Sequence, residues 1–282
     1  MSKDYRITEL CATLAVSRSG YYAWQGRPPG RRAKENELLR ENLRELFEQN
    51  RRVYGSPRLT VSLRRAGWRC GRNRVARQMR SLGLRARQKK AFKPKTTDSK
   101  HPHPIAPNRL KAVGRPKALD QVWVSDITYI DTRQGWIYLA GVMDLCSRKI
   151  VGWACADHLK TTLVQEALSR AVTGRRPRPG LLHHSDRGCQ YASEDYRAQL
   201  QAVKSLPSMS AAGNCYDNAA MESFWSTLKT EWLHQHNFQD QSAAELAIFD
   251  YIETFYNPKR LHSALGYQSP VEFELELLHA KH

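Results

Sequence analysis

The sequence predicts a basic, all-α region followed by an α/β region built on a mixed sheet. Charge is the first observation: residues 1–117 carry 30 Lys and Arg against 8 Asp and Glu, whereas residues 118–282 carry 15 against 19. The second is periodicity, because apolar residues recur at helical spacing before Ala118 and alternate at strand spacing after it. The third is element order: three strands precede alternating helices and strands, which is typical of an α/β layer fold.

Length and composition set the broad class. A chain of 282 residues suffices for one large or two ordinary domains, and 41% hydrophobic residues predict a soluble globular protein. No apolar run is long enough for a bilayer span, and MSKDYRITEL lacks the apolar core of a signal peptide, so we expect a cytoplasmic protein. Six scattered cysteines favour reduced thiols. His183, His184 and Cys189 have no fourth ligand at a suitable spacing, which argues against a zinc site.

The first elements are helices. Residues 7–24 hold a short apolar repeat and then Ser17 as a cap, which resembles a helix–turn–helix, and RPPGRR at 27–32 breaks the chain. Residues 33–49 form the next predicted helix, with its apolar positions at helical spacing.

Residues 54–84 predict a helical hairpin. Pro57 suits the first turn of a helix that runs to about Arg65, Gly67 lies in the turn, and a second helix runs from about Arg72 to Leu82 before Gly83. An apolar stripe on that second helix leaves its arginines on other faces, as docking against duplex DNA requires. The alternative is a basic hairpin with no role in DNA binding. The candidate DNA contacts here are Arg58, Arg72, Arg74, Arg77 and Arg80.

A basic, Pro-rich linker follows. Residues 85–117 hold eleven Lys and Arg against one acid and cannot build a core. Such a segment suits a phosphate backbone, and Lys89, Lys90 and Lys93 are further candidate DNA contacts. A basic half joined to a mildly acidic half predicts that one part holds a polyanion, although a merely solubilising basic surface is the alternative.

The second half alternates strands and helices. The predicted strands are residues 120–130, 136–144, 147–157, 180–186 and 204–210, and the predicted helices are residues 161–172, 193–203 and the segment after Asp217. Asp126 lies in the middle of the first strand, where an unpaired carboxylate is unfavourable and indicates a partner or a metal. Asp186 ends a buried strand, where α/β folds place reactive groups. Each aspartate alone is equally compatible with a cap or a turn.

The last helix, in NCYDNAAMESFWSTLKTEW (214–232), holds the third candidate. At 100° per residue, the helix has a buried apolar stripe that includes Trp225 and Trp232. Glu222 lies with Asn218 and Lys229 on one flank of this stripe. Glu231 lies on the opposite flank without such neighbours, and Asp217 suits an N-cap. Glu222 is therefore the acid placed to lean over a neighbouring sheet.

Three segments resemble the catalytic signatures of DDE transposases: WVSDITY (123–129), HSDRGCQY (184–191) and GNCYDNAAMESFWSTLKTE (213–231). The match is to the IS-three family of bacterial insertion sequences, OrfB type. The 35 residues between Asp186 and Glu222 are the interval typical of that family and of retroviral integrases. Lys229 matches the family's basic residue two turns after the glutamate. Residues 54–92 and 255–274 resemble its helix–turn–helix region and C-terminal extension.

The resemblance implies a fold and a site. The fold would be RNase H-like, a mixed five-stranded sheet flanked by helices, preceded by an all-α helix–turn–helix region. Asp126, Asp186 and Glu222 would be the catalytic residues and the ligands of two Mg²⁺ ions, for which Mn²⁺ can substitute. Lys229 would contact DNA phosphate, with Asn218 and Trp225 in supporting positions. No zinc-binding unit precedes the core, so the integrase comparison extends only to the catalytic domain.

The implied function is DNA transposition: binding of insertion-sequence ends, metal-dependent strand cleavage and 3′-hydroxyl strand transfer by a copy-out–paste-in route. The implied partners are double-stranded DNA (terminal inverted repeats and target), a second copy of the chain, and a companion first-frame protein if this chain is the catalytic half of a frameshift fusion. Bound to DNA, the protein would be nucleoid-associated. The alternatives are a nuclease of the same fold and a DNA-binding protein with an inactive core. The predicted domains are 1–32, 33–92, 93–117, 118–235 and 236–282.

Overall fold

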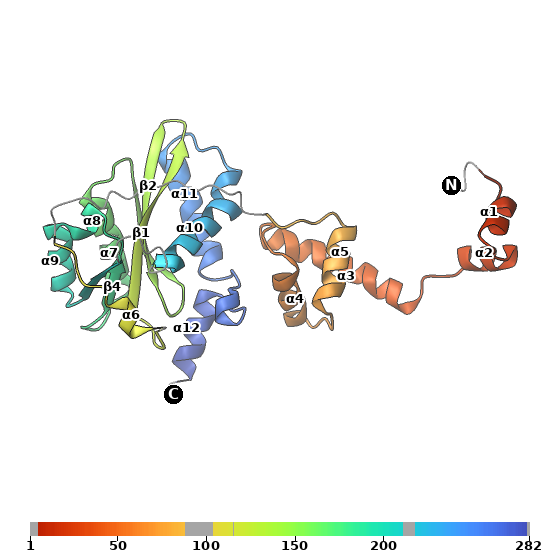
Figure 1. Cartoon of the computed structure of the whole chain (residues 1–282), viewed down its shortest axis with the longest axis horizontal. Helices are drawn as coiled ribbons and strands as arrows, with labels where there is room; N and C mark the ends of the chain where they lie inside the picture. The colour runs from red at the N-terminus through yellow and green to blue at the C-terminus, as the bar shows by residue number, and fades with distance from the viewer. Residues whose placement is uncertain (1–4, 88–103, 115, 211–217, 281–282) are drawn as a thin grey trace. The chain divides into compact units, whose positions relative to one another are not determined.

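The computed structural model describes residues 5–87, 104–114, 116–210 and 218–280, which form two compact units (Figure 1). The first unit comprises residues 1–49 and 55–85, and the second comprises residues 50–54 and 86–282. Within the described ranges, none of the helices has both the length and the apolar character needed to cross a membrane.

The first unit is entirely helical. Its helices are α1 (Ile7–Thr13), α2 (Arg18–Gln25), α3 (Arg31–Gln49), α4 (Ser56–Arg65) and α5 (Arg72–Ser81). Ser17 caps α2 by accepting a hydrogen bond from the backbone N–H of Gly20 at 3.0 Å. A core of buried side chains joins α3, α4 and α5: Leu39, Leu43, Phe47, Leu59, Leu63, Val75 and Met79. The predicted helices are confirmed.

Glycines end both helices of the hairpin. Gly67 and Gly83 have φ values of +87° and +67°, in the left-handed region where a side chain is strained. Pro57 lies in the first turn of α4, where its missing N–H is harmless. The chain can therefore reverse at Gly67 and bring α5 back against α4.

The second unit contains one five-stranded sheet in the order β3-β2-β1-β4-β5. Its strands are β1 (Val122–Thr132), β2 (Gly135–Asp144), β3 (Ile150–Ala156), β4 (Leu182–Ser185) and β5 (Leu206–Met209). The β1–β2 and β2–β3 pairs are antiparallel, whereas β4 pairs parallel with both β1 and β5. The predicted mixed sheet is confirmed, in the RNase H-like arrangement that the resemblance implied.

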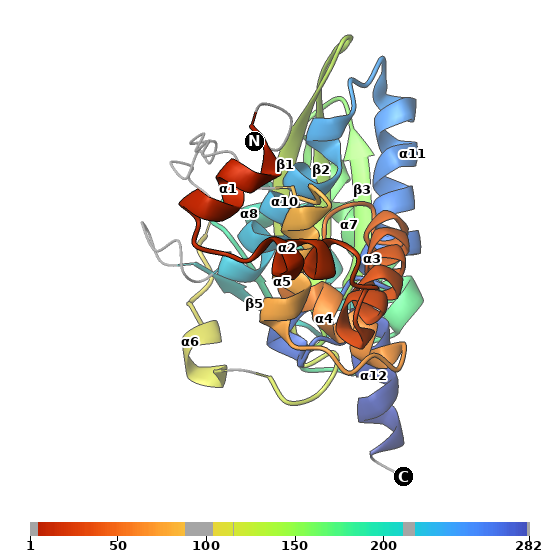
Figure 2. The ribbon, with the colours of Figure 1, turned by 90° about the vertical axis from the view of Figure 1, so that its right-hand side faces the viewer.

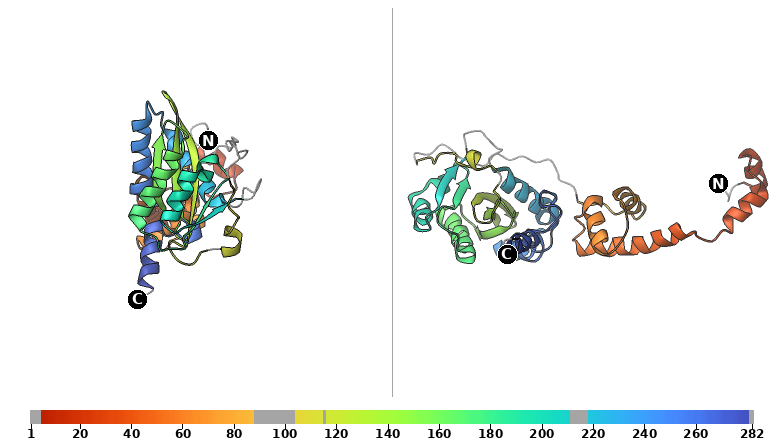
Figure 3. Two further views of the ribbon diagram at one scale, coloured as in Figure 1. Left: turned by 90° about the vertical axis from the view of Figure 1, so that its left-hand side faces the viewer. Right: turned by 90° about the horizontal axis from the view of Figure 1, so that it is seen from below.

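Helices cover both faces of this sheet (Figure 3, right). Gly152 faces α7 (Thr161–Arg175), where an added Cβ would lie 2.3 Å from the Ala167 carbonyl oxygen. Gly141, one strand away, faces α10 (Ala219–Glu231), where a Cβ would lie 2.8 Å from the Trp225 ring. The two glycines thus let one helix approach each face of the sheet closely. Gly141 allows α10 to pack directly on β2 beside β1.

Further short helices and a C-terminal extension complete the unit. They are α6 (Leu110–Val113), α8 (Cys189–Ala192), α9 (Glu194–Ala202), a 3₁₀ turn (Leu233–Gln235), α11 (Gln241–Tyr251), a π-helical turn (Ile252–Tyr256), a second 3₁₀ turn (Ser263–Leu265) and α12 (Pro270–His279). Asn257 joins the extension to the sheet edge, because its side-chain amide donates to the Ile150 carbonyl and accepts from the Ile150 N–H, both at 3.0 Å.

Two adjacent histidines of β4 are buried on opposite faces of the sheet. The His183 Nε2 lies 2.9 Å from the Ser125 hydroxyl and 3.1 Å from the Tyr196 hydroxyl. His184 hydrogen bonds to Ser208 and Ser210. These hydroxyl partners give both rings a structural role.

We expect His183 to make the fold acid-sensitive. Burial, helped by the neighbouring His184, lowers the pKa of His183 from 6.5 to about 3. Between these values the unfolded chain binds a proton that the native state rejects. The stability that depends on a neutral His183 should therefore be fully present above about pH 6.5. The free energy of unfolding should fall, by up to about 1.4 kcal/mol per pH unit, as the pH drops from there toward 3.

The measurement is urea unfolding at several pH values between 4 and 7, on the wild type and on His183→Gln. The variant should show a shallower dependence of stability on pH in this window, because glutamine binds no proton in either the native or the unfolded state. Equal pH dependence in the two proteins would contradict the assignment, as would a protonated His183 imidazole in NMR spectra at pH 5.

Candidate active site

Asp126 projects from the middle of β1 toward α10. Its Oδ1 accepts a hydrogen bond from the Ile127 N–H at 2.9 Å, and its Oδ2 accepts one from the Trp225 indole N–H at 3.1 Å. One oxygen is thus held by the strand and the other by the helix. The Trp225 ring also packs on Gly141, the register partner of Asp126 on β2, so the same side chain seats the helix and orients the carboxylate.

Asp186 immediately follows β4, the parallel neighbour of β1. The last paired residues of the two strands are Val124 and His184, so Asp126 and Asp186 both lie two residues beyond that pair. The Asp186 Oδ1 accepts a hydrogen bond from the Gly188 N–H at 2.9 Å, which turns the chain away from the sheet. The parallel register of β1 and β4 therefore holds the two aspartates level with each other, Asp126 in the middle of the long strand β1 and Asp186 just after the end of β4.

Glu222 is an exposed side chain in the first turn of α10. That turn is fixed to β1 because the Asn218 side-chain amide donates to the Ser125 carbonyl at 3.2 Å, one residue before Asp126. Asn218 is buried, and its Oδ1 has no hydrogen-bond partner among the described residues. Figures 1 and 2 both show α10 running beside β1. Asp217, the predicted cap, lies outside the described residues.

The three carboxyl groups are electrostatically coupled. Burial and then the Asp186 charge raise the pKa of Asp126 from 3.8 to about 8, with a further contribution from Glu222. The hydrogen bonds from Ile127 and Trp225 only partly oppose this rise. Without a cation, Asp126 is therefore mostly protonated at neutral pH, since a third adjacent negative charge is unfavourable.

This donor set fits a hard divalent cation in its chemistry. Carboxylate and amide oxygens are the ligands that Mg²⁺ prefers, and the coupled acids together with the unpartnered Asn218 Oδ1 supply only oxygen. Across the described ranges, however, no three His, Cys, Asp or Glu side chains lie close enough to form a ready-made metal site. An ion would therefore have to draw these groups together.

Lys229 lies two turns after Glu222 on α10. Its Nζ is 4.3 Å from the centre of the Tyr129 ring, and its side chain is half-buried. Burial lowers the pKa of Lys229, and the nearby Asp126 carboxylate opposes that shift. The ammonium group of Lys229 therefore lies within electrostatic reach of Asp126.

The interpretation of Glu231 as an acid without neighbours is wrong. Glu231 is buried, and its two oxygens accept hydrogen bonds from the Arg260 guanidinium at 2.6 and 2.7 Å. The Tyr251 hydroxyl donates to the same carboxylate at 2.6 Å. Both partners belong to the C-terminal extension, so helix geometry alone could not identify them. Trp232 follows the end of α10, and its indole N–H donates to the Ala247 carbonyl of α11.

The candidate DNA-binding arginines differ in their surroundings. Arg72, Arg77 and Arg80 are exposed on α5. Arg74 instead joins α5 to α3, because its Nε donates to the Asn36 side chain at 2.9 Å and its Nη2 lies 3.4 Å from Glu35. Arg58 is half-buried on α4. Lys89, Lys90 and Lys93 lie outside the described residues.

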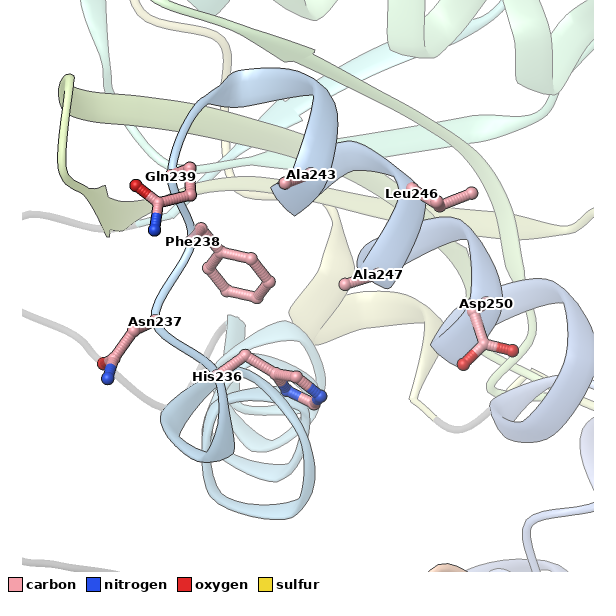
Figure 4. A pocket seen from close by; sticks show the side chains of 8 residues that line it. All are labelled: His236, Asn237, Phe238, Gln239, Ala243, Leu246, Ala247 and Asp250. Atoms are coloured by element: carbon pink, nitrogen blue, oxygen red, sulfur yellow. The ribbon is translucent and has the colours of Figure 1, made fainter.

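One surface hollow of the second unit contains none of the three carboxylates. It is formed by the start of the C-terminal extension and lined by His236, Asn237, Phe238, Gln239, Ala243, Leu246, Ala247 and Asp250 (Figure 4). A large DNA substrate needs an accessible surface rather than an enclosed pocket. The carboxylates are therefore the better candidate site.

Family models match most of the chain. A model described as an integrase core domain matches residues 116–215, a second model with the same description matches residues 204–270, and a model of an HTH-like domain matches residues 33–92. Together these ranges include all the carboxylates of the candidate site and the whole α4–α5 hairpin.

Full-length relatives are found among curated proteins. The chain is 44% identical to the insertion element IS600 uncharacterized 31 kDa protein of Shigella sonnei, covering 94% of this chain and 97% of the relative. It is 39% identical to the transposase for insertion sequence element IS904 of Lactococcus lactis, covering 88% and 98%. It is 38% identical to transposase InsF for insertion sequence IS3A of Escherichia coli, covering 96% and 94%.

Solved structures are more distant. An intasome of simian T-cell lymphotropic virus, in complex with a PP2A regulatory subunit, matches with 16% identity and a TM-score of 0.48, covering 82% of this chain and 73% of that one. The HTLV-2 integrase catalytic core domain in complex with magnesium matches with 15% identity and a TM-score of 0.44, covering 57% of this chain and 99% of that one.

Proposed function

Because this chain belongs to the IS3 family of bacterial transposases, with an integrase core and an HTH-like domain, we propose that it cleaves and joins DNA at the ends of its insertion sequence. Asp126, Asp186 and Glu222 are the catalytic residues of this proposal. The observation that supports it is geometric: the register of β1 and β4 holds Asp126 and Asp186 level, and α10, which carries Glu222, is hydrogen bonded to β1 through Trp225 and Asn218.

The residues have distinct tasks in this mechanism. Asp126, Asp186 and Glu222 would hold two Mg²⁺ ions, for which Mn²⁺ can substitute, and such ions activate an attacking oxygen and stabilise a leaving one. The Trp225 and Ile127 N–H groups orient the Asp126 carboxyl group, which would hold a metal ion in its ionised form. Asn218 fixes the start of α10, and Lys229 offers its ammonium group to a DNA phosphate.

Two successive displacements complete the proposed reaction. Water attacks the phosphodiester at the element's end, the bond to the 3′ oxygen breaks, and a 3′-hydroxyl is released. That hydroxyl then attacks a second phosphodiester in line, whose own bond to a 3′ oxygen breaks and releases a new 3′-hydroxyl, so strands are joined without a covalent protein intermediate. The copy-out–paste-in route fits this chemistry because a single cleaved strand suffices to begin it.

The basic half would bind the DNA. We propose that residues 33–92 dock on the terminal repeat and that residues 93–117 follow the phosphate backbone. Residues 118–235 would be the catalytic domain, residues 236–282 its extension and residues 1–32 a separate helical segment. Because two ends of the element must meet, we propose that the protein acts as at least a dimer on DNA and that this dimer also binds target DNA. A companion first-frame protein would be a further partner. The protein would act in the bacterial cytoplasm, on the nucleoid.

We expect the exposed arginines of α5 to carry the salt dependence of binding. The double variant Arg77→Ala, Arg80→Ala should weaken binding to terminal-repeat DNA and reduce the slope of log K against log salt by about 1.8, because each lost phosphate contact contributes about 0.9. Arg58 and Arg72 can be tested in the same way. The measurement is a binding titration at four salt concentrations.

Arg74 and Arg31 are the controls for this test. Arg74→Ala should lower the stability of the hairpin, since it removes the hydrogen bond to Asn36 and one of the two arginine partners of Glu35, so it is not a clean probe of DNA binding. Arg31 is 94% exposed outside the hairpin, and Arg31→Ala should leave the slope unchanged. An unchanged slope in the Arg77, Arg80 variant would remove α5 from the DNA interface.

A strand-transfer assay on terminal-repeat DNA, with and without Mg²⁺, tests the proposed function as a whole. A transposase gives both cleaved ends and joined products, and only with the metal. A nuclease of the same fold gives cleavage without joining, and a DNA-binding protein with an inactive core gives neither. Either of the last two results would overturn the proposal.

A further inference from the structure

Beside the carboxylates, the β1–β2 hairpin carries an aromatic pair that the proposed mechanism does not use. Trp136 of β2 is 53% exposed, and its ring lies edge-on to Tyr129 of β1, with the ring centres 5.0 Å apart and the planes at 78°. The Lys229 ammonium group contacts the same Tyr129 ring from α10. We call Tyr129, Trp136 and Lys229 the aromatic shelf.

The shelf lies close to the proposed reaction centre. Tyr129 is three residues beyond Asp126 on the same strand, a distance of about 10 Å along β1, and this odd spacing directs the two side chains to opposite faces of the strand. Lys229 is seven residues beyond Glu222 on α10, again about 10 Å. The hairpin and the helix run side by side in two views (Figures 1 and 2). With about 3.4 Å per stacked nucleotide, the shelf lies about three nucleotides from a phosphate held at the carboxylates.

Packing within the hairpin does not account for the exposure of Trp136. Tyr129 and Trp136 are diagonal rather than directly opposite, since Tyr129 faces Tyr138 and Trp136 faces Asp131 in the register. The Trp136 indole N–H donates to none of the described residues. More than half of this large ring therefore faces solvent, and its neighbour Tyr129 contacts the Lys229 ammonium group. A stacking surface and a charge for the phosphate are the two features that single-stranded nucleic acid binding uses.

We propose that the aromatic shelf binds one unpaired nucleotide of the DNA end, with its base stacked on Trp136 and its phosphate near Lys229. The inference rests on the proposed function and specifies the form of its substrate: the last base pairs of the element's end open when it enters the site. Stacking is tolerant of base identity because every base has a flat face, so the shelf favours opening of the end rather than a particular sequence.

Photocrosslinking tests the occupancy of the shelf directly. The probe is a duplex of the terminal repeat that carries 5-iodouracil, which crosslinks to a stacked aromatic ring, at one of the last four positions in turn. The protein is the full chain with Glu222→Gln, which does not cleave. We expect a crosslink from one position, mapped to Trp136 by mass spectrometry, that is lost in Trp136→Ala and retained in Phe249→Ala. Phe249, 50% exposed on α11, is the matched aromatic control.

The functional test measures DNA cleavage by proteins that keep Glu222 and are therefore active. On a fully paired end, Trp136→Ala should cleave about ten-fold more slowly than the wild type, and Trp136→Phe should keep most of the rate. On an end whose last two pairs are mismatched, the defect of Trp136→Ala should shrink to about two-fold, because the opening has already taken place.

The outcomes separate this inference from the proposed function. A wild-type rate for Trp136→Ala on the paired end, or a crosslink that maps away from Trp136, overturns the shelf while transposition stands. If the wild type cleaves no end in Mg²⁺, the proposed function fails, and the crosslink, which needs no cleavage, still decides whether the shelf holds a base. An equal defect of Trp136→Ala on paired and mismatched ends also overturns the role in opening.

Discussion

Replacing Glu222 with Gln should abolish strand cleavage and joining while the protein still binds its DNA ends, and Asp126→Asn and Asp186→Asn should do the same. Each change removes one negative oxygen and keeps the shape of the side chain. A metal clamp contributes several kcal/mol of charge stabilisation in the transition state, so loss of one ligand should slow cleavage on the order of 10³-fold or more.

The Asp126→Asn variant is especially informative because its fold should be intact. Burial and the neighbouring acids raise the pKa of Asp126 to about 8, so its carboxyl group is mostly neutral at pH 7 without a cation, and a neutral amide resembles it. The amide removes the charge but can accept only one of the two hydrogen bonds that the carboxyl group accepts, so the thermal unfolding temperature in EDTA should stay close to that of the wild type. Loss of activity in this variant would then reflect chemistry rather than unfolding.

The measurement is cleavage and strand transfer in Mg²⁺, with a gel-shift assay for binding. Asp195, an exposed acid on α9, is the control, and Asp195→Asn should retain full activity. Near-wild-type joining by any one of the three carboxylate variants would remove that residue from the catalytic set.

Truncating Arg260 should be the most destabilising single change in the C-terminal extension. Arg260→Met leaves the buried Glu231 carboxylate without its two guanidinium hydrogen bonds, and breaking a buried ion pair on one side costs about 3–5 kcal/mol. Glu231→Gln should also destabilise the protein, because it leaves the Arg260 charge buried with a weaker partner. Glu231 is therefore unsuitable as a silent control for Glu222.

A double-mutant cycle checks this assignment. The double variant Glu231→Leu, Arg260→Met removes both charges and should recover much of the stability lost in either single variant, since a buried pair can be replaced by apolar groups at little cost. Stability is measured by urea unfolding. Additive losses in the double variant would mean that the two side chains act independently, against the contacts described.

Local pattern was sufficient to predict the elements that carry the site. Alternation fixed the strand that holds Asp126, turn residues marked the strand end at Asp186, and helical spacing chose Glu222 over Glu231. The interval of 35 residues then related the second acid to the third by resemblance to a family. All of these are features of short segments or of spacing along the chain.

Contacts between distant segments could not be predicted in this way. Arg260 follows Glu231 by 29 residues and Arg74 follows Asn36 by 38, and no periodicity connects them. The indole of Trp225 was expected to anchor α10, but its hydrogen bond to Asp126 depends on how the helix is rotated on Gly141. Such pairings follow from tertiary packing, which one sequence does not reveal.

The amide of Asn257 has a consequence for how the protein behaves among copies of itself. β3 is an outer strand of the sheet, and an outer strand with unpaired N–H and C=O groups is a template for another chain. By bonding both groups of Ile150, Asn257 occupies the place where a sixth strand would begin. The extension therefore blocks one place on the outer edge of the sheet where a second copy of the chain could add a strand.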